Sequence, residues 1–251
     1  MKIRKTSVAG MFYSNNPKEL QQELKYVKEY KNTKKVTAII VPHAGYAYSG
    51  KTAGEAYKQI SNDYKKVILL APNHTVYTKK AVLDENNYWE TPLGKIKIWN
   101  PAINSDAFQI NEAVHKQEHA AEVHLPFLQT KLKDFELLPI IIGDINEVDL
   151  NKITKEIQKL LDKNTLLVIS TDLSHFLTER DAKEEDEETI KNILNLRDVH
   201  PESACGANLL KVANRLFKEL GKKPEFLKYT TSAETTGNRN NVVGYASFII
   251  E

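Results

Sequence analysis

The chain has 251 residues, of which 41% are apolar and 27% charged, as in globular proteins with a sizeable core. Its 35 Lys and Arg against 33 Asp and Glu leave a formal charge of +2, which argues against nucleic acid or an anionic membrane as the main partner. The single cysteine, Cys205, excludes an internal disulfide, and no run is apolar for long enough to be a signal peptide or membrane span. We therefore expect a cytoplasmic protein.

Apolar runs and helical periodicities alternate along the chain, which predicts one α/β domain over residues 1–251. The predicted helices are Asn16 to about Tyr30, Thr52–Ile60, Ser105–His115, Asn151–Leu161 and Pro201–Leu220, the last containing Cys205 and capped by Gly221. The predicted strands are Val36–Val41, Lys66–Ala71, Leu137–Ile142, Leu166–Ser170, Glu225–Thr231 and Val242–Ile250, with antiparallel strands within residues 81–98. The acidic run Glu184–Glu188 is interpreted as a solvated helix face.

Three of the predicted strands lead into a histidine, namely His43, His74 and His175. If these strands are parallel neighbours, the three side chains converge on the carboxyl edge of the sheet, where open α/β sheets bind ligands. Two imidazoles and one anionic ligand would form an open site for a divalent transition metal. The alternative for each histidine is a loop residue that hydrogen-bonds to the backbone.

Two other residues have both a functional and a structural interpretation. Asp172 lies three residues before His175 and is predicted either to orient that imidazole and move protons or to cap the turn after the strand. Cys205 is either a small core residue or a thiolate that supplies the anionic third metal ligand. A thiolate would favour iron, copper or zinc.

The segment Glu118-His119-Ala-Ala-Glu122-Val-His124 is a further histidine-rich motif. It misses the inverted zincin pattern H-x-x-E-H by one residue, because Val123 intervenes. We place His119, Glu122 and His124 in a second wall of the same pocket, as substrate-binding residues. An independent zinc site is the alternative.

A different motif, Gly45–Thr52, satisfies the phosphate-loop pattern G-x-x-x-x-G-K-[ST] between a predicted strand and a predicted helix. The bulky Tyr46 and Tyr48 are awkward where backbone amides must wrap around phosphate. The motif also leaves the histidines unexplained. A nucleotide hydrolase is therefore the least favoured alternative.

Taken together, these motifs resemble the Memo family, named after a mediator of cell motility. The segments that carry the resemblance are Ala9–Tyr13, Pro42–Tyr48, Ala71–His74, Glu118–Pro126, Ser170–His175, Ala204–Gly206 and Gly244–Ser247. They span nearly the whole chain and keep its order. The family fold is similar to that of class III extradiol dioxygenases, which implies a central, mostly parallel mixed sheet with helices on both faces.

The resemblance also implies roles for individual residues. His43, His74 and Cys205 would bind the metal, with Fe(II) expected first and copper or zinc as alternatives. His175, supported by Asp172, would be the acid/base. Two aromatic residues, Phe12 and Tyr48, would line the mouth of the pocket.

Extradiol dioxygenases use a carboxylate where this chain has a cysteine, so the thiolate points to oxygen or redox chemistry other than ring cleavage. The expected function is thus a non-haem-iron-dependent redox or dioxygenase-like enzyme acting on an unidentified small molecule. Possible partners implied by the resemblance are a radical-SAM protein and an AMMECR-like protein. The alternative is a non-catalytic module that uses the inherited pocket to bind a metal, a peptide or a partner protein.

Overall fold

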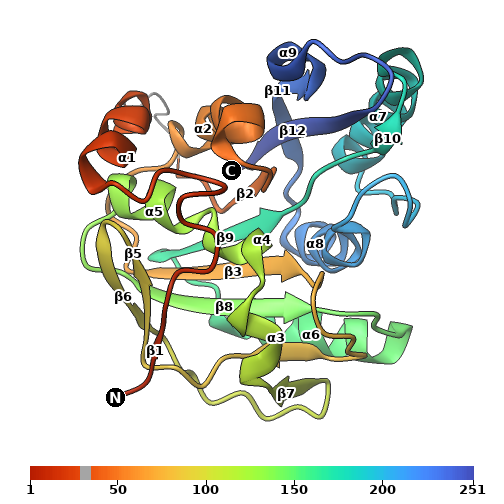
Figure 1. Ribbon diagram of the computed structural model, residues 1–251. Helices are drawn as coiled ribbons and strands as arrows, with labels where there is room; N and C mark the ends of the chain where they lie inside the picture. The colour runs from red at the N-terminus through yellow and green to blue at the C-terminus, as the bar shows by residue number, and fades with distance from the viewer. Residues whose placement is uncertain (29–34) are drawn as a thin grey trace.

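The computed structural model describes residues 1–28 and 35–251, and one mixed sheet runs through it from the first strand to the last (Figure 1). Four parallel strands form its centre, in the spatial order β2, β9, β3, β8. Their bounds are Ala38–Val41, Thr165–Ser170, Lys66–Pro72 and Glu136–Ile142. Nearly every residue of these strands is buried, as their continuous apolar runs predict. The parallel pairing brings the ends of β2 and β3 to one edge.

Strands of both directions extend the sheet on either side of this centre. Beyond β2 lies β12 (Val242–Ile250), which pairs with both β11 (Pro224–Thr231) and β10 (His175–Leu177). Beyond β8 lie β6 (Gly94–Ile98), β5 (Tyr88–Thr91) and β1 (Ile3–Arg4), while β4 (Ala81–Leu83) joins β8 to β7 (Phe108–Ile110). The predicted α/β class with a mostly parallel mixed sheet is confirmed.

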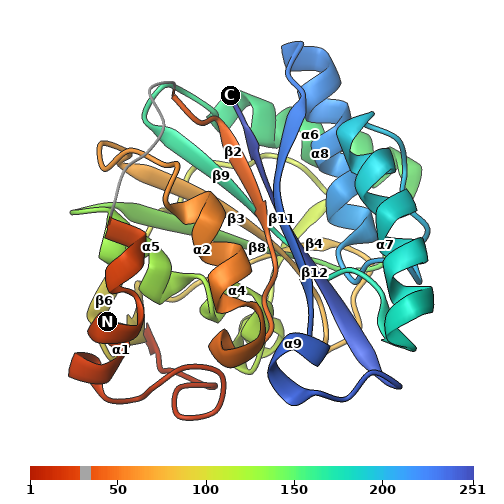
Figure 2. The ribbon, with the colours of Figure 1, turned by 90° about the horizontal axis from the view of Figure 1, so that it is seen from above.

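Helices cover the two faces of the sheet (Figure 2). One face carries α1 (Pro17–Glu23), α2 (Lys51–Tyr57), α4 (His119–Glu122) and α5 (Leu125–Lys131). The other carries α6 (Glu147–Leu160), α7 (Glu179–Leu194) and α8 (Ala207–Leu220). Residues of β3 alternate between the two cores: Val67 and Leu69 belong to the first, Ile68 and Leu70 to the second. Burial on both faces therefore explains the uninterrupted apolar strands.

Two short helices complete the element order, α3 (Glu112–Lys116) and α9 (Ala233–Thr236). Helix α1 begins after Asn16, whose side chain accepts hydrogen bonds from backbone N–H groups of the first turn. A 3₁₀ turn, Lys25–Lys28, follows it, and the remainder of the predicted helix to Tyr30 lies outside the described residues. Within the described ranges, no helix combines the length and apolar sequence needed to cross a membrane.

Two predictions about local structure were wrong. The helix predicted over 105–115 is split into strand β7 and helix α3, because residues Phe108–Ile110 pair with β4. Helix α8 begins at Ala207, so Cys205 precedes it; the Gly206 N–H donates to the Thr171 hydroxyl instead. Gly221 does end this helix, with a φ of 66°.

The acidic run Glu184–Glu188 is exposed on α7, as predicted, except at one position. Asp186 is fully buried, since the helix packs that position against β11 and β12. Its carboxylate accepts hydrogen bonds from the Ser174 backbone N–H at 2.9 Å and from the Tyr229 hydroxyl at 2.7 Å.

Candidate metal centre

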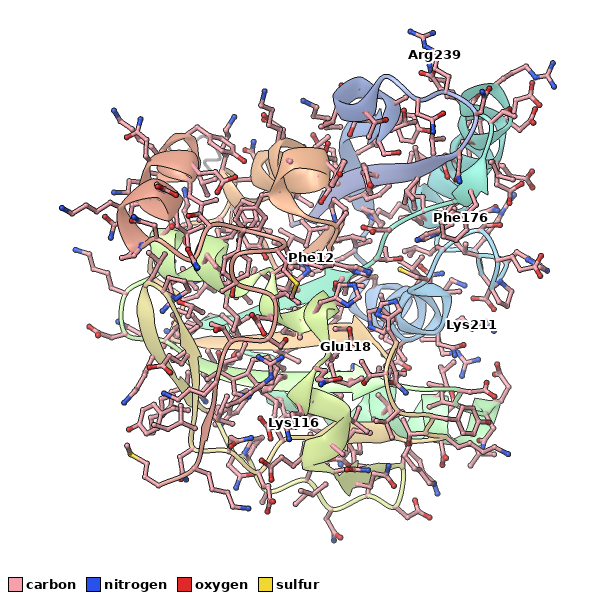
Figure 3. All side chains as sticks on the ribbon, viewed as in Figure 1. Phe12, Lys116, Glu118, Phe176, Lys211 and Arg239 are labelled. Atoms are coloured by element: carbon pink, nitrogen blue, oxygen red, sulfur yellow. The ribbon has the colours of Figure 1, made fainter. Side chains whose placement is uncertain are left out.

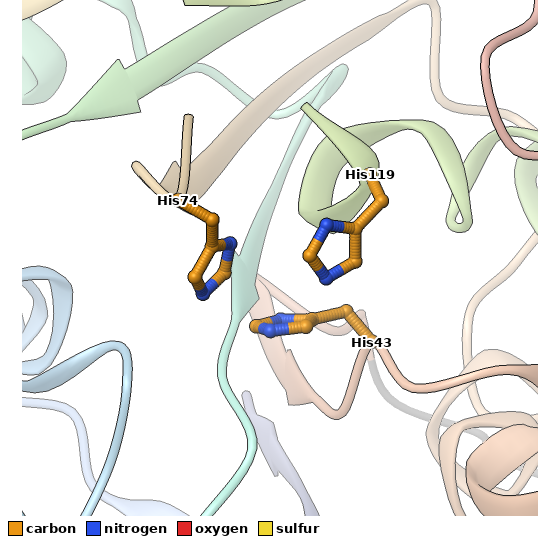
Figure 4. A group of neighbouring side chains, drawn as sticks. All are labelled: His43, His74 and His119. Carbon is orange, nitrogen blue, oxygen red and sulfur yellow. The ribbon is translucent and has the colours of Figure 1, made fainter. Parts of the chain in front are cut away.

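Three imidazoles from separate elements meet at the carboxyl edge of the sheet: His43, His74 and His119 (Figure 4). His43 follows β2, His74 follows β3, and His119 opens α4. One ring nitrogen of each lies within 4.8 Å of the other two. The first two are delivered by parallel strands on either side of β9, as the sequence predicted, whereas only the tertiary fold brings the third beside them.

The Glu118 carboxylate lies close to two of these imidazoles. Its Oε1 lies 3.0 Å from His74 Nδ1 and 3.4 Å from His119 Nδ1. An ionised carboxylate only accepts hydrogen bonds, so His74 Nδ1 carries a proton and, in the neutral ring, His74 Nε2 keeps a free lone pair. Burial of Glu118 is the largest single influence and opposes ionisation, but the hydrogen bond from the His74 ring, the charge of that ring and the backbone N–H groups of Ala120 and His74 together hold the pKa of Glu118 below its usual range.

His43 is the most enclosed of the three, with 2% of its surface exposed. Its Nδ1 lies 2.7 Å from the Ser170 hydroxyl. Burial, and then the neighbouring imidazoles of His74 and His119, hold the pKa of His43 well below its usual range. Burial also lowers the pKa of His119. His43 and His119 are therefore neutral near pH 7, the form in which imidazole binds a metal.

Cys205 lies beside this cluster without belonging to the trio of closely spaced nitrogens. Its sulfur is 3.4 Å from His43 Nε2 and accepts a hydrogen bond from the Asp172 backbone N–H at 3.2 Å. Burial raises the pKa of the Cys205 thiol far above its usual range, with the Asp172 carboxyl as a second cause. Without a cation nearby, this residue is therefore a protonated thiol.

Asp172 contacts His43 in this structure. Its Oδ1 accepts a hydrogen bond from the His43 backbone N–H at 2.7 Å, and its Oδ2 lies 3.9 Å from His43 Nε2. Burial raises the pKa of Asp172 to about 7, against the hydrogen bond from His43. Among the described residues, no hydrogen bond joins Asp172 to His175, so the predicted support of that imidazole by Asp172 is not seen.

His175 lies at the start of β10 and is partly buried, and burial lowers its pKa. It is followed by Phe176, which is 75% exposed and has a φ of 62°, a backbone conformation uncommon for residues other than glycine. Phe12 packs on His119 with ring centroids 4.9 Å apart, and Glu118 directly precedes that histidine (Figure 3). Tyr48 is 45% exposed. Substrate contacts by Phe12, Tyr48 and His119 stay predictions.

The other two predicted substrate-binding residues are fully buried against protein groups. The Glu122 carboxylate forms an ion pair of 2.6 Å with Arg4. The backbone N–H groups of Ser7 and Val8 also donate to it. His124 Nε2 lies 2.9 Å from the hydroxyl of Ser170. Both side chains are therefore held by protein groups, and substrate contact by either stays a prediction.

Sequence reasoning missed Glu118 and Ser170 as parts of the site. The position of Glu118, directly before His119, was the available signal for the first. Ser170 ends β9 directly after the apolar run Leu166–Ile169, and a polar residue at that place was the signal for the second.

The phosphate-loop pattern forms a helical turn in place of an open loop. Residues Tyr46–Gly50 are π-helical, and the backbone N–H groups of Tyr48 and Ser49 donate to the Gly45 carbonyl. The Thr52 hydroxyl is buried in a hydrogen bond with Thr230. Two of the amides that would bind phosphate and the hydroxyl that would bind Mg²⁺ therefore already have protein partners.

Comparison with known proteins agrees with the sequence motifs. Residues 4–249 match the family described as Memo-like protein. The chain is 34% identical over 278 residues to a MEMO1 family protein of Saccharolobus solfataricus, which covers 96% of this chain and 97% of the relative. It is 35% identical over 273 residues to a MEMO1 family protein of Aquifex aeolicus, with 99% of each chain covered. It is also 33% identical over 268 residues to one of Methanosarcina barkeri, covering 99% and 100%. This chain therefore belongs to the Memo family.

Proposed function

We propose that the chain binds one divalent transition metal ion through the Nε2 atoms of His43, His74 and His119. The observation that carries the proposal is the convergence of three ring nitrogens within 4.8 Å, from three separate elements. The Nδ1 atoms of His43 and His74 are held by oxygens of Ser170 and Glu118, an outer-shell arrangement typical of metal-ligating histidines. Neutral imidazole suits iron, copper and zinc alike.

Iron is the metal that we propose first, on the family resemblance, with Cys205 as an additional or alternative ligand. The Cys205 sulfur lies 3.4 Å from His43 Nε2, close enough to share an ion with only a small side-chain movement. A bound cation would offset the effect of burial and deprotonate the thiol.

We further propose that the protein is a redox enzyme for a small molecule. A bound iron would supply open coordination positions and redox chemistry. The chain itself would supply proton transfer: Asp172, with its pKa raised to about 7 by burial, can hold or release a proton near neutral pH. His175, partly exposed at the rim, is the proposed acid/base toward the substrate.

A second candidate function, a partner-binding module, is favoured by apolar side chains exposed near the histidines. Met11, Tyr77 and Phe176 are 73%, 72% and 75% exposed and lie within three residues of Phe12, His74 and His175, respectively. Exposed aromatic residues of this kind are common in protein interfaces. A radical-SAM or AMMECR-like protein is the partner that the resemblance suggests.

Metal stoichiometry after anaerobic loading with Fe(II) tests the metal site. We expect about one iron per wild-type chain and strong loss in His119→Ala. His200→Ala is the control, because His200 is an exposed histidine outside the cluster, and it should load like wild type. Cys205→Ala shows whether the thiolate is a ligand. Equal loading of His119→Ala and His200→Ala would refute the three-histidine site.

His175→Ala then separates the two candidate functions. An enzyme should keep its iron and lose turnover, because proton transfer is lost while the three ligands remain. A binding module should keep partner binding in this variant, and no substrate should be turned over by the wild type.

A further inference from the structure

The Ser170 hydroxyl connects three groups that are remote in sequence. It donates to the Ala120 carbonyl at 2.7 Å, and it lies 2.7 Å from His43 Nδ1 and 2.9 Å from His124 Nε2. Ser170 and both imidazoles are buried, with at most 2% of each residue exposed. Water therefore does not compete for these contacts.

Counting hydrogens assigns the direction of each contact. A serine hydroxyl has one hydrogen to donate and two lone pairs to accept with. The Ala120 carbonyl can only accept, so the single hydrogen of Ser170 is used there. Both histidine nitrogens must then donate to the Ser170 oxygen: His43 through Nδ1–H and His124 through Nε2–H. This assignment uses the full hydrogen-bonding capacity of the hydroxyl.

The second nitrogen of His124 supports this assignment independently. His124 Nδ1 is buried and has no hydrogen-bond partner among the described residues. In the Nε2–H tautomer this orphan atom is a lone pair, which is less costly to leave unpaired than a buried N–H group. The opposite tautomer would bury an unsatisfied N–H and set two lone pairs against each other at 2.9 Å.

We propose that Ser170 and His124 are positioning residues that hold His43 in the Nδ1–H tautomer, so that its Nε2 lone pair is free for a metal ion. The tautomer assignment stands on hydrogen bonding alone. Only its last step, the purpose of the free lone pair, rests on the proposed metal-binding function. His124, which is fully buried, thereby acts on the site through Ser170.

The ¹⁵N chemical shifts of the histidine rings in metal-free protein test the tautomer directly. In wild type we expect His43 to show a protonated Nδ1 and an unprotonated Nε2, and His124 to show the reverse. His43 with a protonated Nε2 would overturn the proposal. Because this measurement needs neither metal nor a variant, it does not depend on the proposed function or on the folding of a mutant.

Two variants test the positioning role, with Zn²⁺ binding measured by calorimetry as a second readout. Ser170→Ala should let His43 exchange between tautomers and should weaken Zn²⁺ binding about 10- to 100-fold, the usual effect of losing an outer-shell partner. Ser247→Ala is the matched control, because Ser247 is a fully buried serine of the same sheet whose hydroxyl has no partner among the described residues. It should match wild type in both readouts.

His124→Leu and His124→Gln separate loss of the donor from loss of the ring. Leucine removes the N–H that donates to Ser170, so the Ser170 hydroxyl loses one of the two donors that fix its orientation toward the Ala120 carbonyl, and His43 should begin to exchange between its tautomers. Glutamine can still donate to Ser170 and should restore the wild-type ring shifts of His43. Wild-type tautomers and Zn²⁺ affinity in both Ser170→Ala and His124→Leu would overturn the proposal. The predicted tautomers in a wild-type protein that binds no metal would support the assignment and refute the proposed function.

Discussion

Glu118 binds His74 at two points. Its Oε2 accepts a hydrogen bond from the His74 backbone N–H at 2.6 Å, and its Oε1 lies 3.0 Å from the Nδ1 of the same residue. One carboxylate thus fixes both the position of the chain at the end of β3 and the rotation of the ring. The same Oε1 also lies 3.4 Å from His119 Nδ1, so Glu118 is close to two imidazoles of the cluster.

Glu118→Gln should therefore weaken Zn²⁺ binding by about 10- to 100-fold, measured by calorimetry. The amide has only one acceptor oxygen and cannot accept from both the ring and the backbone of His74. Glu136→Gln serves as the control, because the Glu136 carboxylate pairs at 2.5 Å with the well-exposed Lys97. Equal affinities of the two variants would contradict the proposed role of Glu118.

Arg4→Ala should destabilise the fold by about 3–5 kcal/mol, because it leaves the carboxylate of Glu122 buried without its cation. Arg4 also donates to the carbonyls of His115 at 2.7 Å and Glu118 at 3.0 Å, so its removal frees further buried acceptors. The measurement is the free energy of unfolding from guanidinium titration.

Arg215→Ala is the control for this loss. Arg215 pairs with Glu147, whose side chain is 69% exposed, so its removal should cost at most about 1 kcal/mol. Similar costs for the two arginine variants would show that the Arg4 pair is not the fixed, buried contact described above.

Asp186→Asn should change how stability depends on pH. Burial raises the pKa of Asp186 above its ordinary value of 3.8, against hydrogen bonds from Ser174 and Tyr229. A carboxyl group whose pKa is raised by folding contributes stability that is fully present below 3.8 and is lost as pH rises through the folded pKa. Asparagine does not titrate.

The stability of wild type relative to Asp186→Asn should therefore fall as pH increases from about 3.5 toward 7, the direction set by linkage between proton binding and folding. Denaturant titrations of both proteins at several pH values give this difference, and other titrating groups cancel. A difference that stays constant or increases with pH would show that the folded pKa of Asp186 is not raised.

ATP and GTP with Mg²⁺ should show no saturable binding by calorimetry, in spite of the phosphate-loop pattern. The amides of Tyr48 and Ser49 are used within the helical turn, and Thr52 is engaged by Thr230. Lys51→Ala is the matched variant. Nucleotide binding that Lys51→Ala abolishes would contradict this prediction.

The central strands and the histidines that follow them could be predicted from the sequence. A strand buried on both faces has to be apolar without interruption, which makes β2, β3 and β9 recognisable. Parallel neighbours end at one edge, so His43 and His74 were expected to meet. Both steps depend on local sequence and on general rules of sheet packing.

Only the tertiary structure decided which other side chains complete the site. Glu118, with His119 next to it, meets His74 across 44 residues of chain, and Ser170 meets His43 across 127. The burial of Asp186 in α7 is equally non-local. Hydrophobic periodicity specifies which face of an element is buried, but the partners of a polar side chain depend on how distant segments pack together. The sequence therefore determined the edge of the sheet at which the site forms, and the packing of α4 against β3 and β9 determined its third histidine and the orientation of its imidazoles.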